Sequence, residues 1–279
     1  MLLIKHCGLL IAALLAHLMF ANKDNLAMED SGQPERSTVE KMAQKQKIVF
    51  LITEDPDNYK AHETVPKFAE MLEEKYGYEV TVLLGRGGHG SYTYPQADVI
   101  SRADLLVVFA RRIALPHQQM KALKNYIESG KPVVGIRTAN HAFTVNGKIE
   151  EGFEDWPEFV SDILGCENRG YGPVEPGTEV TVPPDAVSHP VLKDIATRQW
   201  HSNGNVYLVA PLLDQKATVL LTGKVNDIVQ PIAWTRTAGE SRVFYTSLGY
   251  PTDFETPVFV KLLINAIQWA LHGETRPDD

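Results

Sequence analysis

The feature that most constrains the fold is an alternation of apolar runs and amphipathic segments in the first half of the chain. The run Ile48–Ile52 is continuously apolar and rich in β-branched residues, which is typical of a strand buried on both faces. Later segments repeat an order of strand, helix and strand. This order predicts parallel strands joined by right-handed crossovers, with helices on both faces of one sheet. We therefore predict an α/β fold of the flavodoxin-like type. The expected elements here are strands at 48–53, 79–84, 104–110 and 132–136 and helices at 63–76 and 116–129.

The second half of the chain is less regular. A short helix is expected over 155–164. Asp155 and Glu158 have the spacing of a capping box, and Pro157 suits the first turn. No linker and no internal repeat separates the halves, so we expect one domain over residues 47–272. The remaining predicted elements are strands at 179–182, 218–222, 232–235 and 242–247 and a final helix at 257–271.

The N-terminal segment differs in composition from the rest of the chain. Residues 1–21 combine a short start that carries Lys5 with an apolar stretch over 8–21. This pattern predicts a secretory signal peptide cleaved after Ala21 or Ala27, and hence a periplasmic or secreted protein. The alternative is an uncleaved membrane anchor, although the stretch is shorter than the roughly 20 residues that span a bilayer. We expect a flexible spacer over 22–46 and a short tail over 273–279.

Charge and cysteine content exclude several classes of protein. The chain of 279 residues has a formal net charge of −8 and no run of Lys and Arg, which argues against a nucleic-acid partner. Membrane contact is expected only through an uncleaved signal. Cys7 lies in the predicted signal, so Cys166 alone remains and no internal disulfide can form. We expect no cofactor, and a homo-oligomer is one open alternative.

Ligands of an open parallel sheet bind beyond the carboxyl ends of its strands, where the loops leave the sheet. In this chain those loops collect ionisable side chains, so several such groups are expected to converge on one edge. The loop residues concerned are Glu54, Asp55, Tyr59, Lys60, His62, Glu63, Arg86, His89, Arg111, Arg112, Arg137, Asn140, His141, Tyr250 and Asp253.

Several of these residues also have a structural explanation. The pair His62 and Glu63 can be the start of a helix, with a carboxylate near its positive end. Arg111 and Arg112 are more readily explained as solvated loop charges. Trp200 can line a pocket or cover the edge of the core. The glycines over 85–90 match no phosphate-binding motif and indicate a mobile turn.

The segment 135–139 is the sharpest functional signal. A turn of small residues follows directly after a predicted buried strand, which is the layout of a nucleophile elbow. The residue presented there is Arg137. A guanidinium stays protonated and cannot attack a carbonyl, but it can hold a ligand oxygen through a bidentate fork. Chemistry based on a thiolate at this position is therefore not expected.

Four blocks of sequence resemble the trehalose-utilisation (ThuA-like) family. They are Thr53–Thr64, Gly135–Phe143, Gln230–Thr235 and Arg242–Gly249, and they occur in that order. The resemblance covers nearly all of Lys47–Leu271. It implies a class I glutamine amidotransferase-like fold and a link to sugar catabolism. Two departures matter, because many members carry histidine where this chain has Arg137 and Tyr250.

These observations lead to a hypothesis of an exported protein that acts on, or binds, a glycoside or an oxidised (keto) sugar without glutaminase activity. A reaction would be that of a hydrolase, isomerase or lyase, with His141 as the proton carrier and Glu54 as its carboxylate partner. The alternatives are a non-catalytic sugar-binding or accessory module and a metal-dependent hydrolase. A metal site would use His62, Glu63, His141 and His201, and a structural alternative packs His141 under Phe143 and Trp156. The residues expected to bind the ligand are Arg137, Tyr59, His62, Glu63, Trp200, Tyr250 and Asp253.

Overall fold

The computed structural model describes residues 44–273. The predicted signal peptide over 1–21, the predicted spacer up to residue 43 and the tail from residue 274 lie outside the described residues. Within the described part, no helix is both long and apolar enough to cross a lipid bilayer.

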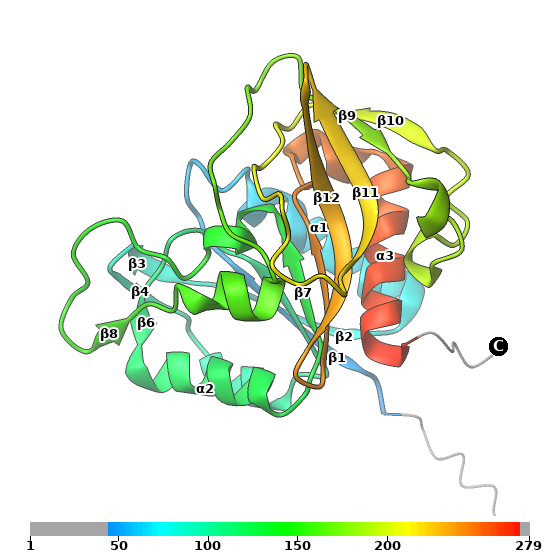
Figure 1. The fold of residues 1–279 in the computed structure, drawn as a ribbon. Helices are drawn as coiled ribbons and strands as arrows, with labels where there is room; N and C mark the ends of the chain where they lie inside the picture. Colours follow the sequence, from blue (N-terminus) through cyan, green and yellow to red (C-terminus); the bar gives the residue numbers. More distant parts are fainter. Residues whose placement is uncertain (1–43, 274–279) are drawn as a thin grey trace, which may run out of the picture. The chain divides into compact units, whose positions relative to one another are not determined.

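A nine-stranded mixed sheet forms the centre of the fold (Figure 1). Five of its strands are parallel and lie in the order β2-β1-β5-β7-β13. Numbered along the chain, this is the 2-1-3-4-5 order of flavodoxin-like sheets. The flavodoxin-like α/β fold predicted from the sequence is therefore confirmed. The parallel strands are β1 (Lys47–Ile52), β2 (Glu79–Leu84), β5 (Leu105–Phe109), β7 (Val133–Ile136) and β13 (Ser241–Thr246).

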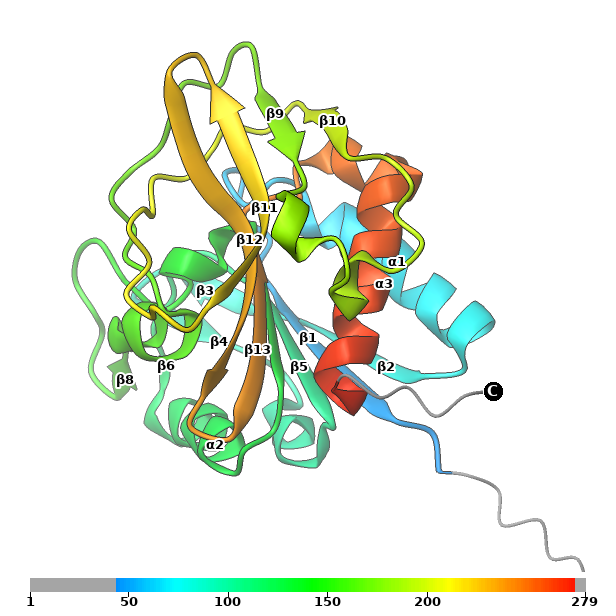
Figure 2. The same cartoon turned by 45° about the vertical axis from the view of Figure 1, so that its right-hand side comes forward.

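The other part of the sheet is antiparallel, which the sequence pattern did not predict. From β13 it continues in the order β12-β11-β9-β10, and each neighbouring pair is antiparallel (Figure 2). A long hairpin, rather than crossover helices, builds this half, because β11 and β12 are joined directly by a turn. The antiparallel strands are β9 (Thr178–Thr181), β10 (Gln199–Ser202), β11 (Thr218–Val225) and β12 (Ile228–Ala238).

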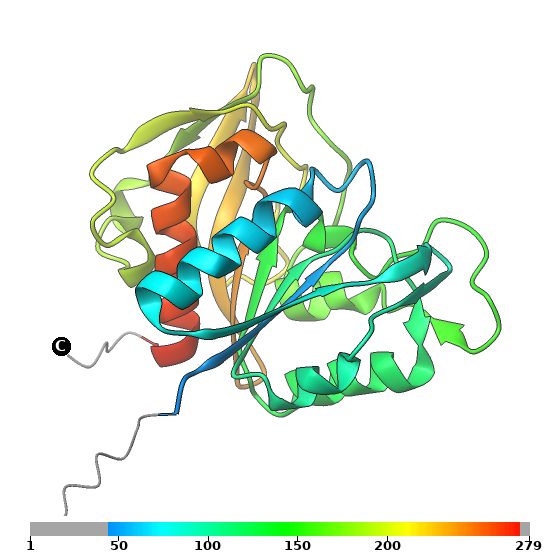
Figure 3. The ribbon, with the colours of Figure 1, turned by 180° about the vertical axis from the view of Figure 1, so that it is seen from behind.

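Helices cover both faces of the sheet. Alternate residues of β1 point to opposite faces, so Ile48 and Phe50 join one apolar core while Val49 and Leu51 join the other. The first core lies under α1 and α3, which cross in front of the sheet in Figure 3. The second lies under α2 and a short π-helix. These helices are α1 (Ala61–Tyr76), α2 (His117–Glu128), α3 (Pro257–His272) and the π-helix η3 (Phe159–Leu164).

Two local predictions are wrong. The glycine-rich segment over 85–90 is not a turn alone, because it contributes β3 and the connecting turn to a β-hairpin, and a Cβ at Gly90 would fall 2.1 Å from the Lys148 carbonyl oxygen. The helix expected over 155–164 begins only at Phe159, because the Asp155 carboxylate accepts from the backbone N–H of Val145 instead of capping a helix. The remaining elements are β3 (Arg86–Gly88), β4 (Ser91–Thr93), β6 (Leu115–Pro116), β8 (Phe153–Glu154) and the 3₁₀ helices η1 (Ala97–Arg102), η2 (Arg137–His141), η4 (Pro184–Ala186), η5 (Pro190–Leu192) and η6 (Pro251–Glu255).

Candidate functional site

A buried asparagine ties together the loops that follow β1, β5 and β7. The amide nitrogen of Asn58 donates to the hydroxyl of Thr53 at 2.9 Å and to the carbonyl of Phe109 at 2.8 Å. Its amide oxygen accepts from the hydroxyl of Thr138. Since Asn58 is fully buried, these bonds hold the three loops at the carboxyl edge of the sheet in a fixed arrangement.

Two pockets open at this edge and share one wall. We call the larger one, of about 730 Å³, the tyrosine pocket, and the smaller one, of about 600 Å³, the side pocket. Arg112, His141 and Tyr171 line both. The tyrosine pocket is also lined by Pro56, Asp57, Tyr59, Lys60, Arg111, Asn146, Gly172, Val174, Asn205, Tyr207, Tyr250 and Pro251. The side pocket is also lined by Asn140, Thr144, Pro157, Glu158, Val160, Ser161, Cys166, Glu167, Asn168 and Gly170.

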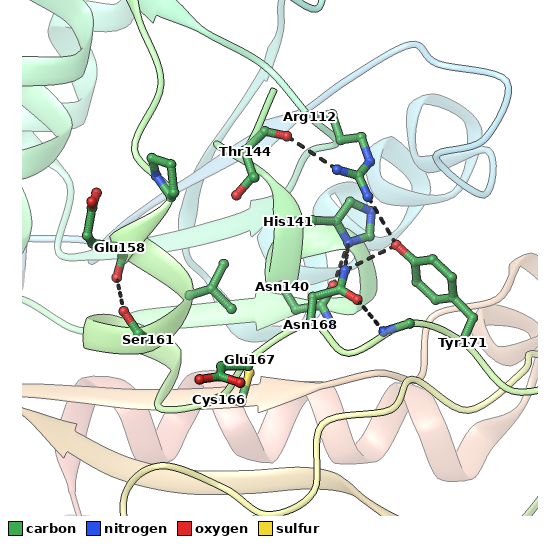
Figure 4. A pocket seen from close by; sticks show the side chains of 13 residues that line it. Arg112, Asn140, His141, Thr144, Glu158, Ser161, Cys166, Glu167, Asn168 and Tyr171 are labelled. Atoms are coloured by element: carbon green, nitrogen blue, oxygen red, sulfur yellow. Dashed lines mark hydrogen bonds between the residues drawn. The ribbon is translucent and has the colours of Figure 1, made fainter. Parts of the chain in front are cut away.

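His141 lies in the shared wall and is only 3% exposed. Its Nδ1 is 2.5 Å from the amide oxygen of Asn140, and this bond is made by the tautomer that carries the proton on Nδ1 and the lone pair on Nε2. Asn168 also approaches Nδ1, at 3.1 Å, and donates to the hydroxyl of Tyr171 at 3.1 Å (Figure 4). Among the hydrogen bonds of residues 44–273, those of the His141 ring involve Nδ1 and none involves Nε2. The ring centroids of Tyr171 and Tyr207 are each 6.0 Å from that of the imidazole, so tyrosines, and not Phe143 and Trp156, are its aromatic neighbours.

His141 is neutral at ambient pH. Burial is the main reason that its pKa falls from 6.5 to about 3, and the positive charges of Arg112, Arg111 and Arg137 lower it further. The more distant carboxylate of Asp55 acts in the opposite direction. The pKa of His141 is therefore well below the ordinary value of a histidine side chain. In the free protein His141 can accept a hydrogen bond from a ligand but holds no proton on Nε2 to give.

Arg137 follows β7 at the predicted elbow, but its guanidinium is fully buried. Nη1 donates to the carbonyl of Ser247 at 2.6 Å, and Nη2 donates to the amide oxygen of Asn205 at 2.7 Å. The arginine backbone is left-handed, with φ 44°, and its carbonyl accepts from the hydroxyl of Tyr245 at 2.8 Å. The fork that was expected to hold the ligand is thus already engaged by the protein, so Arg137 does not reach the pocket surface.

Three tyrosine rings enclose this buried cation. The guanidinium carbon of Arg137 lies 3.9 Å from the ring centroid of Tyr59, 5.0 Å from that of Tyr207 and 5.7 Å from that of Tyr250. These rings line the tyrosine pocket, so Arg137 forms the layer beneath its floor. The arginine ion pairs found among the described residues do not include Arg137. Cation–π contacts and neutral acceptors therefore contact the guanidinium directly, while the buried carboxylate of Asp253 helps to raise the pKa of Arg137 without forming an ion pair.

Two arginines that follow β5 form the rim of the tyrosine pocket. Arg111 forms ion pairs with Asp55 at 3.4 Å and with Asp57 at 3.2 Å. Arg112 has a left-handed backbone, with φ 50°, and its backbone N–H donates to the carbonyl of His141 at 3.1 Å. Both side chains bond to other groups of the protein, Arg111 to carboxylates and Arg112 to neutral oxygens. The carboxylate of Asp55 is itself 2.6 Å from the Nε2 of His89.

The remaining predicted residues of the strand-end loops separate into two groups. Tyr59 and Tyr250 both line the tyrosine pocket, next to His141. Asp253 is buried, and its carboxylate accepts from the backbone N–H groups of Gly249 and Tyr250 at 2.8 and 2.9 Å. Its role is to hold the turn that presents Tyr250. Glu54 is exposed and lines neither pocket, so the partners of the imidazole are amides and not this carboxylate.

Other predicted residues lie away from both pockets. His62 and Glu63 are in the first turn of α1, where their side chains approach each other to 3.7 Å. Trp200 is on β10 and packs against the core under α1 and α3, so it covers the edge of that core. His201 pairs with Glu179 on β9. Among residues 44–273, no group of three or more His, Cys, Asp or Glu side chains is arranged to hold a metal ion, so the four-residue set proposed from the sequence is not assembled.

Sequence reasoning missed several residues of the site. Tyr171, Asn168 and Gly172 come from the segment between η3 and β9, while Asn205 and Tyr207 come from the segment after β10. Backbone hydrogen bonds join the two segments, such as Gly172 N–H to the Val206 carbonyl at 2.9 Å. Neither segment has a periodic pattern. Only the resemblance of the flanking blocks could have drawn attention to them.

Cys166 lies at the edge of the side pocket but is 0% exposed. Burial raises the pKa of its thiol to about 12, with only partial compensation from Arg169 and Arg236. Because the thiolate is the reactive form, Cys166 is unreactive at neutral pH. The elbow after β7, where an amidotransferase nucleophile would be expected, carries Arg137.

The fold and the site define an α/β protein of the flavodoxin-like type, with pockets at the carboxyl edge of its sheet and an arginine at its elbow. The chain belongs to the trehalose-utilisation (ThuA) family, whose match covers residues 18–270. Membership supports a carbohydrate-related role. No curated protein matches the chain.

Solved structures with the same fold agree with this assignment. A ThuA-like protein from Bacteroides uniformis superimposes with a TM-score of 0.61 at 18% identity, over 84% of this chain and 95% of that one. A ThuA-like protein from Parabacteroides merdae gives a TM-score of 0.58 at 16% identity, over 85% and 93%. A cytoplasmic protein from Salmonella typhimurium gives 0.52 at 12% identity, over 83% and 100%. At such identities the similarity establishes the fold alone.

Proposed function

We propose that the tyrosine pocket binds a sugar, either a glycoside or a keto sugar, and that His141 exchanges a proton with it. One observation carries the proposal: His141 is in the wall shared by two pockets, where Nδ1 is bonded to Asn140 and none of the hydrogen bonds of residues 44–273 involves Nε2. Aromatic walls with a few fixed polar groups are typical of small-molecule sites. The rings of Tyr59, Tyr171 and Tyr250 provide the aromatic surface.

The roles of the other residues follow from their contacts. The amide of Asn205 lines the pocket, where its oxygen is held by Arg137 and its nitrogen donates to the carbonyl of Gly172 at 3.2 Å. It therefore presents a fixed polar edge to the ligand. Arg137 positions Asn205 and the tyrosine rings from below and does not itself contact the sugar. The polar side chains that would contact the ligand are held in fixed orientations before it binds. Such preorganisation favours selective binding.

A non-catalytic sugar-binding module is the second candidate, and one observation favours it. The imidazole of His141 is oriented by amides rather than by a carboxylate, and its lowered pKa makes it a weak base in the free protein. Such a residue can act in recognition as a hydrogen-bond acceptor alone. Turnover and binding must therefore be measured separately.

The test compares His141→Ala with His201→Ala, whose imidazole is on β10 outside both pockets. Titration calorimetry with trehalose, methyl glucosides and keto glucosides measures binding, and product analysis measures turnover. We expect His141→Ala to retain sugar binding while turnover falls about 10²–10⁴-fold, the usual effect of losing a positioned acid or base. The His201→Ala variant should behave as the wild type. Normal turnover by His141→Ala would disprove the catalytic role. Sugar binding without any turnover by the wild type would favour the non-catalytic sugar-binding module. Failure of every sugar to bind would disprove the function itself.

We also propose that the chain is exported and that it has no glutaminase activity. The export proposal rests on the composition of residues 1–21, which lie outside the described residues. Protein from the native host should begin between about Asn22 and Glu29, and an intact Met1 in a cytosolic fraction would contradict this. Ammonia release from glutamine that is lost in Cys166→Ala would contradict the absence of glutaminase activity.

A further inference from the structure

The rim residue Arg112 differs from its neighbour Arg111 in its partners. Arg111 is neutralised by two aspartates. Arg112 donates instead to neutral oxygens, at 3.0 Å to the amide of Asn146 and at 3.4 Å to the hydroxyl of Tyr171. The third acceptor is the carbonyl of Thr144, at 3.4 Å. No carboxylate within residues 44–273 forms an ion pair with Arg112, so its charge is uncompensated.

The backbone conformation of Arg112 directs its guanidinium toward the wall that the two pockets share. Non-glycine residues seldom adopt the left-handed conformation that Arg112 has, with φ 50°. The conformation is held because the N–H groups of Arg112 and Ile113 donate to the carbonyls of His141 and Ala142, at 3.1 and 2.7 Å. The loop after β5 is thus bonded to the residues that follow β7, and the guanidinium faces His141 and Tyr171 (Figure 4). A strained backbone that is fixed by tertiary bonds is typical of functional sites.

A second cation lies under the same pocket. Arg137 is fully buried beneath the tyrosine rings and forms no ion pair in the described part of the chain, although the buried Asp253 carboxylate acts on its charge and helps to raise its pKa. Its field reaches the pocket through protein of low dielectric rather than through water, so it is screened only weakly. The same cations, Arg112, Arg111 and Arg137, also lower the pKa of His141, after burial as the largest cause.

We propose that the tyrosine pocket recognises an acidic sugar, a uronate, an aldonate or a glycoside of one, whose carboxylate is bound by the guanidinium fork of Arg112. This inference rests on the proposed sugar-binding function and narrows its ligand class. A planar carboxylate matches the fork of one guanidinium in two parallel hydrogen bonds. The hydroxyl of Tyr171, already within reach of Arg112, lies beside the same position and can donate to the anion.

Binding of the anion has a consequence for His141. The charged groups that act on this imidazole are Arg112, Arg111 and Arg137, which lower its pKa, and Asp55, which raises it. A carboxylate held by Arg112 would offset the nearest positive charge, so the pKa of His141 rises when the acidic sugar is bound. The ligand would thereby convert a weak base into a residue better suited to proton exchange at ambient pH.

The experiment titrates glucuronate, glucose and glucose 6-phosphate into wild type, Arg112→Gln, Arg112→Lys and the control Arg198→Gln. Arg198 is exposed, and no side-chain contact of it is found among the described residues. We expect glucuronate to bind at least about tenfold more tightly than glucose, as a charge-assisted hydrogen bond implies. The preference should vanish in Arg112→Gln, fall in Arg112→Lys because a lysine lacks the fork, and persist in Arg198→Gln. It should also weaken as salt is raised.

The outcomes separate the inference from the function on which it rests. Equal binding of glucose and glucuronate would overturn the inference and leave the sugar site standing. Tight binding of glucose 6-phosphate without glucuronate would overturn the carboxylate assignment. Absence of any sugar binding would overturn both. If Arg112→Gln fails to fold, imidazole NMR of the wild type decides: the His141 pKa must rise with glucuronate, and an unchanged value overturns the inference.

Discussion

The floor and the rim of the tyrosine pocket each contain an arginine that forms no ion pair among the described residues, but the protein accommodates the two charges in different ways. Each has an arginine that follows a parallel strand, Arg137 after β7 and Arg112 after β5, with nearly equal left-handed φ values of 44° and 50°. Neither forms an ion pair with any carboxylate in residues 44–273. The floor arginine is 0% exposed and the rim arginine lines both pockets. Burial therefore separates Arg137, which holds the site together from below, from Arg112, whose side chain lines both pockets.

The two arginines differ in how the loss of hydration of their charges is compensated. A buried charge without an opposite charge loses its hydration, which costs several kcal/mol unless the protein supplies other acceptors. Arg137 has the Ser247 carbonyl, the Asn205 amide and three aromatic faces, although its Nε stays unsatisfied. Arg112 keeps contact with water in the pocket. Its net contribution to stability is small, as for other accessible charges.

The largest expected effect is therefore on the floor. Arg137→Ala removes a fully buried side chain and leaves the acceptors of Ser247 and Asn205 unsatisfied, so the free energy of unfolding should fall by at least about 3 kcal/mol. Arg137→Met, which refills much of the volume, should recover part of the loss. Arg112→Ala should change stability by no more than about 1 kcal/mol. Urea unfolding followed by the fluorescence of buried Trp234 measures all three.

Two results would contradict the structural role of Arg137 and the ligand role of Arg112. An Arg137→Ala protein of normal stability but greatly reduced sugar affinity would mean that the buried guanidinium contacts the ligand, as the sequence predicted. A large loss of stability in Arg112→Ala would make the rim structural and would remove the basis for a ligand role there.

The second effect is on the pH dependence of stability, and it comes from His141 between the two regions. Its folded-state pKa of about 3 is below the ordinary 6.5, so folding favours the neutral ring. The contribution is fully present above pH 6.5 and is lost as pH falls toward 3, because the unfolded chain then binds a proton that the folded chain does not. The expected slope is about 1.4 kcal/mol per pH unit within that window.

Urea unfolding of wild type and His141→Gln between pH 7 and the acid limit of folding checks this slope. Other groups contribute to the total pH dependence, so the difference between the two proteins is the informative quantity. A His201→Gln control on β10 should keep the wild-type slope. Identical slopes for wild type and His141→Gln would show that folding does not lower the pKa of this ring, contrary to the prediction.

A third and smaller effect is expected at Gly204, which packs directly against the floor. A Cβ added there would lie 2.8 Å from the Nη1 of Arg137 and 3.1 Å from the Cβ of Tyr250. Gly204→Ala should therefore destabilise the fold by about 1–3 kcal/mol and weaken sugar binding through displacement of Tyr250. Gly88 in the exposed β3 strand has no atom within 4 Å of such a Cβ and is the matched control. Equal stability of the two alanine variants would mean that the floor is loosely packed.

The parallel half of the fold could be predicted from the sequence because each buried strand is an apolar run bounded by a turn, as at Ile48–Ile52. The antiparallel half could not, since the long β11–β12 hairpin depends on partners far away in the chain. The same limit applies to the site. Arg137 was located at the elbow, yet its burial depends on Asn205 and Tyr207, which come from a segment without any pattern. The role of Asn58 was equally hidden, because three loops must converge before its amide has partners.

The smallest expected effect concerns the thiol of Cys166, which tests whether the side pocket is as tightly sealed as the floor. Its pKa of about 12, against an ordinary 9.0, implies about a thousandfold less thiolate at neutral pH than in an exposed cysteine. In a Cys7→Ser background, which leaves Cys166 as the single thiol, a disulfide reagent should label the native protein negligibly and the urea-unfolded protein completely. Cys166→Ala should leave sugar binding within about twofold of the wild type, because the buried sulfur offers a ligand no polar contact. Rapid labelling of the native protein, or loss of turnover in Cys166→Ala, would instead make the side pocket an accessible and chemically active part of the site.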